Sequence, residues 1–203
     1  MCDLVVMHGG EAACEVARHL AKQVRAMVPK SFAIKTVAMN DHLDVWAAVL
    51  ASTTKPACFL YVAQTVENDA PAEEAGKAIR HYTKPRSCKF CSNTTAAAAA
   101  KNQHYERCGA GCPYVDEEGA QFGALDVAYA VVCIGDTNLL LDRQTTTAKD
   151  CNAAGQKLDK ALGVLGGTCL IERCEANEAE GLELAIDPWT ERFAAALKAK
   201  YAS

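Results

Sequence analysis

The stretch Val-Ala-Tyr-Ala-Val-Val-Cys-Ile-Gly-Asp-Thr-Asn, residues 127–138, decides the fold class of this chain. Its first eight residues are nearly all apolar, and this length suits one buried strand. The strand runs directly into a Gly-Asp turn at Gly135 and Asp136. Continuous rather than alternating hydrophobicity indicates burial on both faces, which is typical of parallel strands covered by helices. The stretch therefore predicts an α/β protein.

Strand and helix patterns alternate on either side of this stretch. Apolar runs at residues 4–7, 32–39 and 57–63 predict three earlier strands, and residues 168–171 predict a fifth. Asp187 is expected to cap a last helix, with Pro188 at its first position. Alternation of this kind predicts a five-stranded parallel sheet with right-handed crossovers and helices on both faces. Periodicity alone does not choose between the common strand orders.

The composition narrows the classes of function. The 203 residues suffice for a single domain, 1–203, with a substantial core. A formal net charge of -4 argues against a nucleic-acid surface. No apolar run reaches the roughly 20 residues that a membrane-spanning helix needs. We expect no signal peptide, because the first residues have neither a basic flank nor a small-residue cleavage site. We therefore expect a cytoplasmic protein that binds neither nucleic acid nor membrane.

The sequence predicts a third helix that opens at residues 69–71 and carries Ala75, Ile79 and Tyr82. Residues 83–124 form a cysteine-containing insertion between this helix and the fourth strand. Without a secretion signal, the eleven cysteines of the chain indicate reduced thiols or metal ligands rather than disulfides. The insertion holds one C-x2-C pair and one C-x3-C pair, a spacing close to that of tetrahedral zinc sites. The candidate zinc ligands are Cys88, Cys91, Cys108 and Cys112. A metal-free loop that carries thiols and a redox-active pair are the alternatives.

Other cysteines and the two tryptophans fall on expected strand or helix faces. We interpret them as packing residues, because free cysteine behaves as a small apolar side chain and tryptophan buries a large area. They are Cys14, Cys58, Cys133, Cys151, Cys169, Trp46 and Trp189.

The closing stretch Gly-Leu-Glu-Leu-Ala-Ile-Asp-Pro-Trp, residues 181–189, carries a family resemblance together with the Gly-Asp turn at residue 135. The ending Asp-Ala-Pro of the loop after the third strand, residues 69–71, adds to it. On these motifs the chain resembles the flavodoxin-like FMN-binding domain of the diflavin reductase family. The resemblance covers residues 3–82 and 125–200. It implies a three-layer flavodoxin-like sandwich with strand order 2-1-3-4-5.

The resemblance also implies that three loops at the carboxyl edge of the sheet hold FMN. The first would enclose the phosphate at a helix N-terminus, and the other two would lie along the flavin ring. A segment at residues 174–178 stands where the family has a stretch beside the ring. The implied cofactor-binding residues are His8, Gly9, Gly10, Glu11, Ala12, Ala13, Gln64, Thr65, Val66, Glu67, Asn68, Gly135, Asp136, Thr137, Asn138 and Leu139. For His8, a capping or partly buried histidine is the alternative.

The implied function is electron transfer by bound FMN between a reductase and an acceptor. The chain would then be an oxidoreductase component without a catalytic acid, base or nucleophile, since the flavin does the chemistry. Its redox partner would be an NADPH/FAD reductase module or an acceptor protein. Glu11, Val66 and Leu139 depart from the family pattern, which has two glycines and an aromatic there. The alternative is therefore a flavodoxin-like domain that has lost FMN and acts as a binding or assembly module, with a zinc-stabilised insertion.

Overall fold

The structure is a computed structural model, and it describes residues 3–42, 44–45, 57–66, 69–83, 128–138, 151–164 and 167–201. Several residues singled out above lie outside these ranges. They are Trp46, Glu67, Asn68, Leu139 and the four candidate zinc ligands Cys88, Cys91, Cys108 and Cys112. The structure therefore does not test the zinc prediction or most of the insertion.

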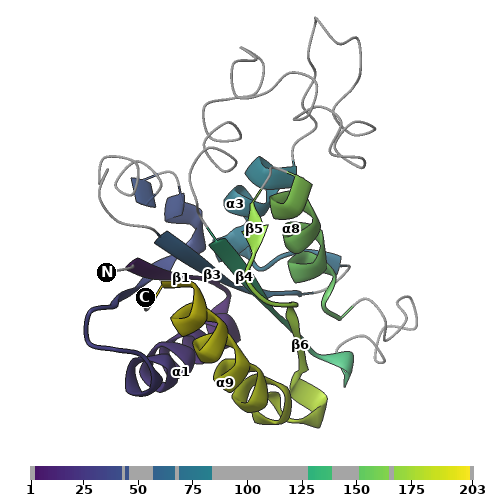
Figure 1. Ribbon diagram of the computed structural model, residues 1–203. Coiled ribbons are helices and arrows are strands. Elements are labelled where there is room, and N and C mark those ends of the chain that lie inside the picture. The colour runs from purple at the N-terminus through teal and green to yellow at the C-terminus, as the bar shows by residue number, and fades with distance from the viewer. Residues whose placement is uncertain are drawn as a thin grey trace, which may run out of the picture.

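A parallel sheet forms the centre of the described fold (Figure 1). Its strands are β1 (Asp3–Gly9), β2 (Ala33–Ala38), β3 (Ala57–Gln64), β4 (Ala128–Gly135), β5 (Thr168–Cys169) and β6 (Cys174–Asn177). The strand order is β2-β1-β3-β4-β5, and β6 also pairs with β4. All pairings are parallel. The predicted order 2-1-3-4-5 is thus confirmed.

Helices cover both faces of the sheet, as predicted (Figure 1). The helices α1 (Glu11–Met27) and α9 (Leu182–Tyr201) lie on one face, and α3 (Glu73–Thr83) and α8 (Ala153–Val164) lie on the other. Successive β1 residues alternate between the two cores. Leu4 and Val6 join the core beneath α1 and α9, whereas Val5 and Met7 join the core beneath α3 and α8. This three-layer arrangement explains why the buried stretches of β1, β3 and β4 are apolar without interruption.

The fifth strand differs from the single run predicted at residues 168–171. It is divided into β5, which pairs with Ala128 and Tyr129, and β6, which pairs with the carboxyl half of β4. The strand is interrupted because polar groups between β5 and β6 form a hydrogen bond and an ion pair with helices outside the sheet. The Glu172 carbonyl accepts a 2.8 Å hydrogen bond from Trp189 Nε1, and Arg173 reaches a carboxylate of α8. Of the two halves, β6 is the one that reaches the carboxyl end of β4.

The last helix begins six residues earlier than Asp187 and Pro188 predict. It begins at Leu182, after Gly181 (φ 93°), and Pro188 lies inside it. An interior proline removes the helical bond to the carbonyl four residues back. Here that carbonyl belongs to Leu184, which is an exposed residue. The Asp187 carboxylate instead accepts hydrogen bonds from His19 and Gln23 of α1.

The packing predictions hold for most described residues. Trp189 is 1% exposed and stacks on Phe193 with ring centroids 5.1 Å apart. Cys58, Cys133 and Cys151 are buried, and Cys14 is half-buried. The prediction for Cys169 is wrong, because this residue is exposed. It lies in the two-residue strand β5, both of whose residues are exposed at the end of the sheet.

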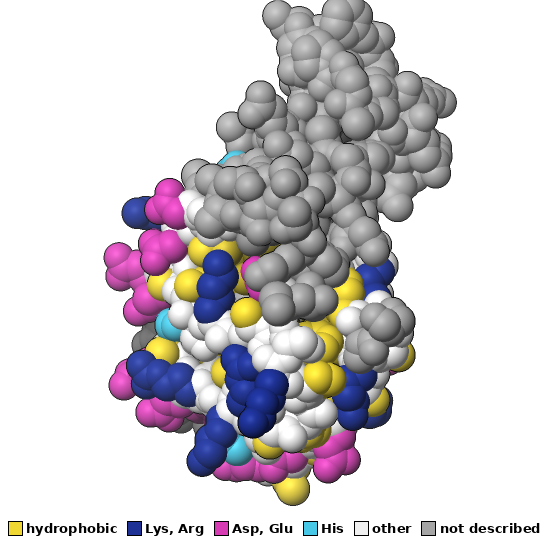
Figure 2. Space-filling model, turned by 60° about the vertical axis from the view of Figure 1, so that its left-hand side comes forward, with side chains coloured by type: hydrophobic (Ala, Val, Ile, Leu, Met, Phe, Trp, Pro, Cys, Tyr) yellow, Lys and Arg dark blue, Asp and Glu magenta, His cyan; other side chains and the backbone are white. Residues whose placement is uncertain are grey.

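The described surface mixes charges of both signs. Figure 2 shows lysine and arginine side chains in separate groups among acidic ones, rather than as one continuous basic surface. Such mixing is ordinary for a globular domain. Within the described ranges, no helix is long and apolar enough to cross a membrane.

The exposure of Cys169 predicts its reactivity. Iodoacetamide is expected to alkylate Cys169 in the native protein faster than Cys174, because Cys169 is exposed and Cys174 is buried. Burial raises the pKa of both thiols, to about 11 for Cys174, so accessibility makes the difference. Peptide mass spectrometry over a time course measures both rates, and the Cys169→Ser variant identifies the fast site. Equal protection of the two thiols in the folded protein would contradict the placement of β5.

Candidate functional site

The first loop joins β1 to α1 at two glycines that serve close packing. A Cβ on Gly9 would lie 2.3 Å from the Ala75 Cβ and 2.8 Å from Ala75 backbone atoms. Gly10 has φ 120° and ψ 160° and provides no side-chain cap for α1. Glu11 follows as an exposed acidic residue of the first helical turn. The sequence predicts a close backbone approach here, and in this structure the neighbour at Gly9 is α3.

Gln64, the last residue of β3, supplies the cap that Gly10 lacks. Its Oε1 accepts a hydrogen bond from the Ala12 N–H at 3.2 Å. A Cβ on Gly10 would lie 2.3 Å from this Oε1 and 3.1 Å from the Ala72 Cβ. The side-chain amide of Gln64 therefore lies against Gly10 at the N-terminus of α1, where the resemblance places the phosphate.

His8 lies near the end of β1, between Ala38 of β2 and Val62 of β3. Burial lowers the pKa of its imidazole below the ordinary 6.5, and Arg18 acts in the same direction, against Glu74. At neutral pH the ring is therefore uncharged. This agrees with the partly buried histidine that the sequence leaves open as an alternative.

The second loop is tied to β4 and α8. The Thr65 N–H donates to the Ile134 carbonyl at 2.8 Å, and Thr65 Oγ1 accepts from the Ala154 N–H at 3.1 Å. Thr65 is only 5% exposed, so these two bonds satisfy polar groups in the interior. Farther along, the Val66 N–H donates to the Ala70 carbonyl.

Val66 cannot follow the path of the glycine that the family has there, because a β-branched residue avoids positive φ. The turn is made elsewhere in the loop. Asp69, with φ 58°, is the one non-glycine residue with positive φ among the described residues. Lys157 of α8 donates to its carbonyl at 3.3 Å. Asp69 supplies this turn because its short polar side chain tolerates the left-handed region.

The third loop begins at a glycine for steric reasons. A Cβ on Gly135 would lie 1.7 Å from the carbonyl oxygen of Cys151, the residue that leads into α8. This distance excludes every side chain without movement of the backbone. The Asn138 N–H then donates to Asp136 Oδ1 at 2.8 Å, which closes a local turn.

Asn177 at the end of β6 holds the third loop in place. Its Oδ1 accepts from the Thr137 N–H at 3.1 Å, and its Nδ2 donates to Thr137 Oγ1 at 3.0 Å. The same Oδ1 accepts from the Ala179 N–H at 3.2 Å. Sequence reasoning noted the segment 174–178 but missed this positioning role. The signal for it was an amide residue at the end of a short strand, where its side chain can bond neighbouring backbone groups.

Acidic groups gather beside the third loop. Burial raises the pKa of the Glu178 carboxyl above its ordinary value, and the Asp136 carboxylate raises it further. The Asp136 carboxylate thus lies close enough to Glu178 to disfavour a second negative charge there, in addition to the effect of burial.

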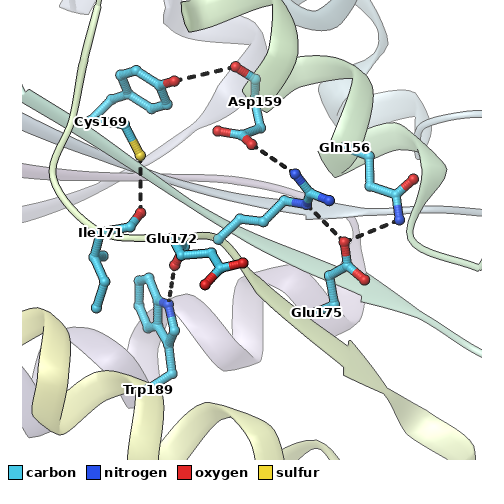
Figure 3. A network of polar contacts seen from close by, with 9 residues as sticks. Gln156, Asp159, Cys169, Ile171, Glu172, Glu175 and Trp189 are labelled. Atoms are coloured by element: carbon cyan, nitrogen blue, oxygen red, sulfur yellow. Dashed lines mark hydrogen bonds and ion pairs between the residues drawn. The ribbon is translucent and has the colours of Figure 1, made fainter.

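Arg173, the residue before β6, links this strand to α8. Its guanidinium contacts Asp159 Oδ2 at 3.1 Å and Glu175 Oε1 at 2.7 Å. Glu175 also accepts from Gln156 of α8 at 3.1 Å. Figure 3 shows Gln156, Asp159 and Glu175 close together between α8 and the strand. Side chains as well as the ladder therefore hold β6 in place.

The described residues fit FMN in part. The backbone of the first loop, with two glycines and a helix N-terminus, has the form of a phosphate cradle. Gln64 Oε1 already accepts one N–H of this cradle, that of Ala12, and lies against Gly10. Within the described ranges, no group of three or more His, Cys, Asp or Glu residues could hold a metal ion.

Comparisons with known proteins support the fold and a partial sequence relationship. No known protein-family description matches the chain. Methionine synthase reductase from Caenorhabditis elegans is 33% identical over 73 residues, which cover 36% of this chain and 9% of that protein. A cysteine-to-serine mutant of flavodoxin from Pseudomonas aeruginosa superposes with a TM-score of 0.54 at 18% identity. That match covers 98% of this chain and 99% of the flavodoxin. The predicted flavodoxin-like fold is confirmed.

The bonds of Asn177 predict its contribution to stability. Asn177→Ala is expected to lower the free energy of unfolding by about 1–3 kcal/mol, because it leaves partly buried polar groups of the third loop without partners. Urea denaturation measures the change. The matched control Asn138→Ala alters an exposed amide of the same loop and is expected to cost less than about 0.5 kcal/mol. Equal losses in the two variants would contradict the positioning role.

The lowered pKa of His8 predicts a pH dependence of stability. As pH falls below 6.5, the unfolded chain takes up a proton at His8 before the folded protein does, so the free energy of unfolding falls. Urea denaturation at about pH 7.5 and about pH 5.5 brackets the ordinary histidine pKa. The His8→Gln variant is expected to lose less stability than the native protein over this interval. An NMR titration that placed the His8 pKa above 6.5 would contradict the prediction.

Proposed function

We propose that this chain is an FMN-binding electron-transfer domain of the flavodoxin type. The observation that carries the proposal is the joining of the loops at one edge of the sheet. Gln64 forms a hydrogen bond with the first loop, Thr65 with β4, and Asn177 with the third loop. Ligands of open parallel sheets bind at this edge. The partial match to a methionine synthase reductase and the flavodoxin-like fold support the same function.

The residues that would hold FMN are those that the resemblance implies. Gly9, Gly10 and Ala12 would surround the phosphate, and the second and third loops would border the ring. When bound, FMN supplies the group that accepts and donates electrons. The chain contributes the neutral His8 ring at the end of β1, the Asp136 carboxylate and the rigid frame held by Asn177.

The proposal extends to partners and to the organisation of the chain. The matched segment is 9% of the reductase relative, so we do not ascribe the activity of that whole protein to this chain. We propose that a separate NADPH/FAD reductase module or an acceptor protein exchanges electrons with the domain in the cytoplasm. We also propose one domain, 1–203, in which 83–124 is an insertion.

A second function is favoured by the Gln64 side chain. A cradle already filled by an internal amide is what a domain without FMN would have, and Glu11 adds negative charge beside it. Such a domain would act as a binding or assembly module. Its insertion would be stabilised by zinc on Cys88, Cys91, Cys108 and Cys112, because two closely spaced thiol pairs can complete a tetrahedral site.

Titration with FMN distinguishes the two functions. Electron transfer predicts saturable binding of one FMN per chain, with a Kd below about 10 µM, seen as quenching of flavin fluorescence. The amide signals of Ala12, Thr65 and Thr137 are expected to shift on binding, whereas that of Lys198 in the last turn of α9 is the internal control. Absence of binding at millimolar FMN favours the binding module. One zinc per chain by elemental analysis of the reduced protein supports the metal-stabilised insertion, and none overturns it.

A further inference from the structure

We propose that Gln64 is an internal competitor for the phosphate of the ligand and thereby sets the preference of the site between flavins with and without a phosphate. The inference rests on the proposed function, because it assumes that the three loops receive a flavin. Its structural basis is one contact, the 3.2 Å hydrogen bond from the Ala12 N–H to Gln64 Oε1.

The position of Gln64 is fixed by its backbone. The residue ends β3 in register with Ile134 of β4. Its carbonyl accepts a 3.0 Å hydrogen bond from the Ala72 N–H, so the backbone of Gln64 is held in place. From this fixed Cα the side chain crosses to α1, where its Oε1 lies 2.3 Å from the place of a Gly10 Cβ. Gly10 and Gln64 are therefore matched, since a side chain at residue 10 would collide with the amide.

Gln64 and a phosphate would use the same donor. The first N–H groups of a helix have no intrahelical acceptor, and the positive end of the helix dipole favours negative charge there. An amide oxygen satisfies such an N–H without bringing a net charge. A phosphate can bind Ala12 only after Gln64 leaves, and the lost hydrogen bond weakens the net affinity. A flavin without a phosphate leaves Gln64 in place and loses nothing.

This competition predicts how substitutions at Gln64 affect two ligands. In the native protein, FMN and riboflavin are expected to bind with Kd values within about threefold of each other. Gln64→Ala is expected to tighten FMN about tenfold, the scale of one competing hydrogen bond, and to leave riboflavin unchanged. Gln64→Glu keeps the shape but adds a charge that repels phosphate, so it is expected to weaken FMN alone.

Fluorescence titration with each flavin tests these expectations. The matched control is Gln23→Ala, which removes a partly buried glutamine whose Nε2 bonds Asp187, on α1 but away from its N-terminus. Circular dichroism confirms that each variant is folded, and Gln64→Glu tests the idea if Gln64→Ala does not fold. Equal changes for FMN and riboflavin, or a native preference for FMN that Gln64→Ala leaves unaltered, would overturn the proposal.

Inorganic phosphate separates failure of this inference from failure of the flavin function. The Ala12 amide signal is expected to shift with millimolar phosphate in Gln64→Ala and to stay unchanged in the native protein. If no flavin binds to any variant but this difference is seen, the flavin function fails and the role of Gln64 stands. An identical phosphate response in both proteins, or none in either, overturns the role of Gln64 whatever the flavins do.

Discussion

The whole arrangement depends on the burial of β4 on both of its faces. Every residue from Ala128 to Gly135 is buried, and the strand pairs with β3 on one side and with β5 and β6 on the other. Burying a strand in this way requires that all its backbone groups be paired and that helices cover it above and below. The strand then ends at Gly135, where the carbonyl of Cys151 leaves no room for a side chain. The end of the core is thereby also the beginning of the candidate site.

The sequence was sufficient for those parts of the fold that follow from hydrophobicity. Unbroken apolar runs predicted β1, β3 and β4, and the family resemblance selected the strand order that the sheet has. The predictions failed where a polar contact from elsewhere in the chain overrode a local signal. Asp187 and Pro188 form a good helix start by local rules, yet Asp187 is engaged by His19 and Gln23 of α1. Glu172 and Arg173 interrupt the fifth strand for a similar reason.

The candidate site shows the same division. Its loops could be located from strand ends and glycines, because those features are local. What each glycine accommodates could not be predicted, since Ala75 and Gln64 come from 66 and 54 residues farther along than Gly9 and Gly10. The role of Asn177 was hidden for the same reason, as its partner Thr137 lies 40 residues away. The local patterns of a single sequence carry no information about long-range side-chain contacts.

The helix α1 obtains its support from distant parts of the chain, and this has a consequence for folding. Its N-terminus is capped by Gln64, 52 residues from Ala12, and its outer side is joined to Asp187, 168 residues from His19. Closing such long loops costs conformational entropy before the contacts compensate for it. During synthesis, α1 therefore emerges without either support and acquires the first only when β3 has left the ribosome. The first helix thus acquires its final support only when α9 has been synthesised.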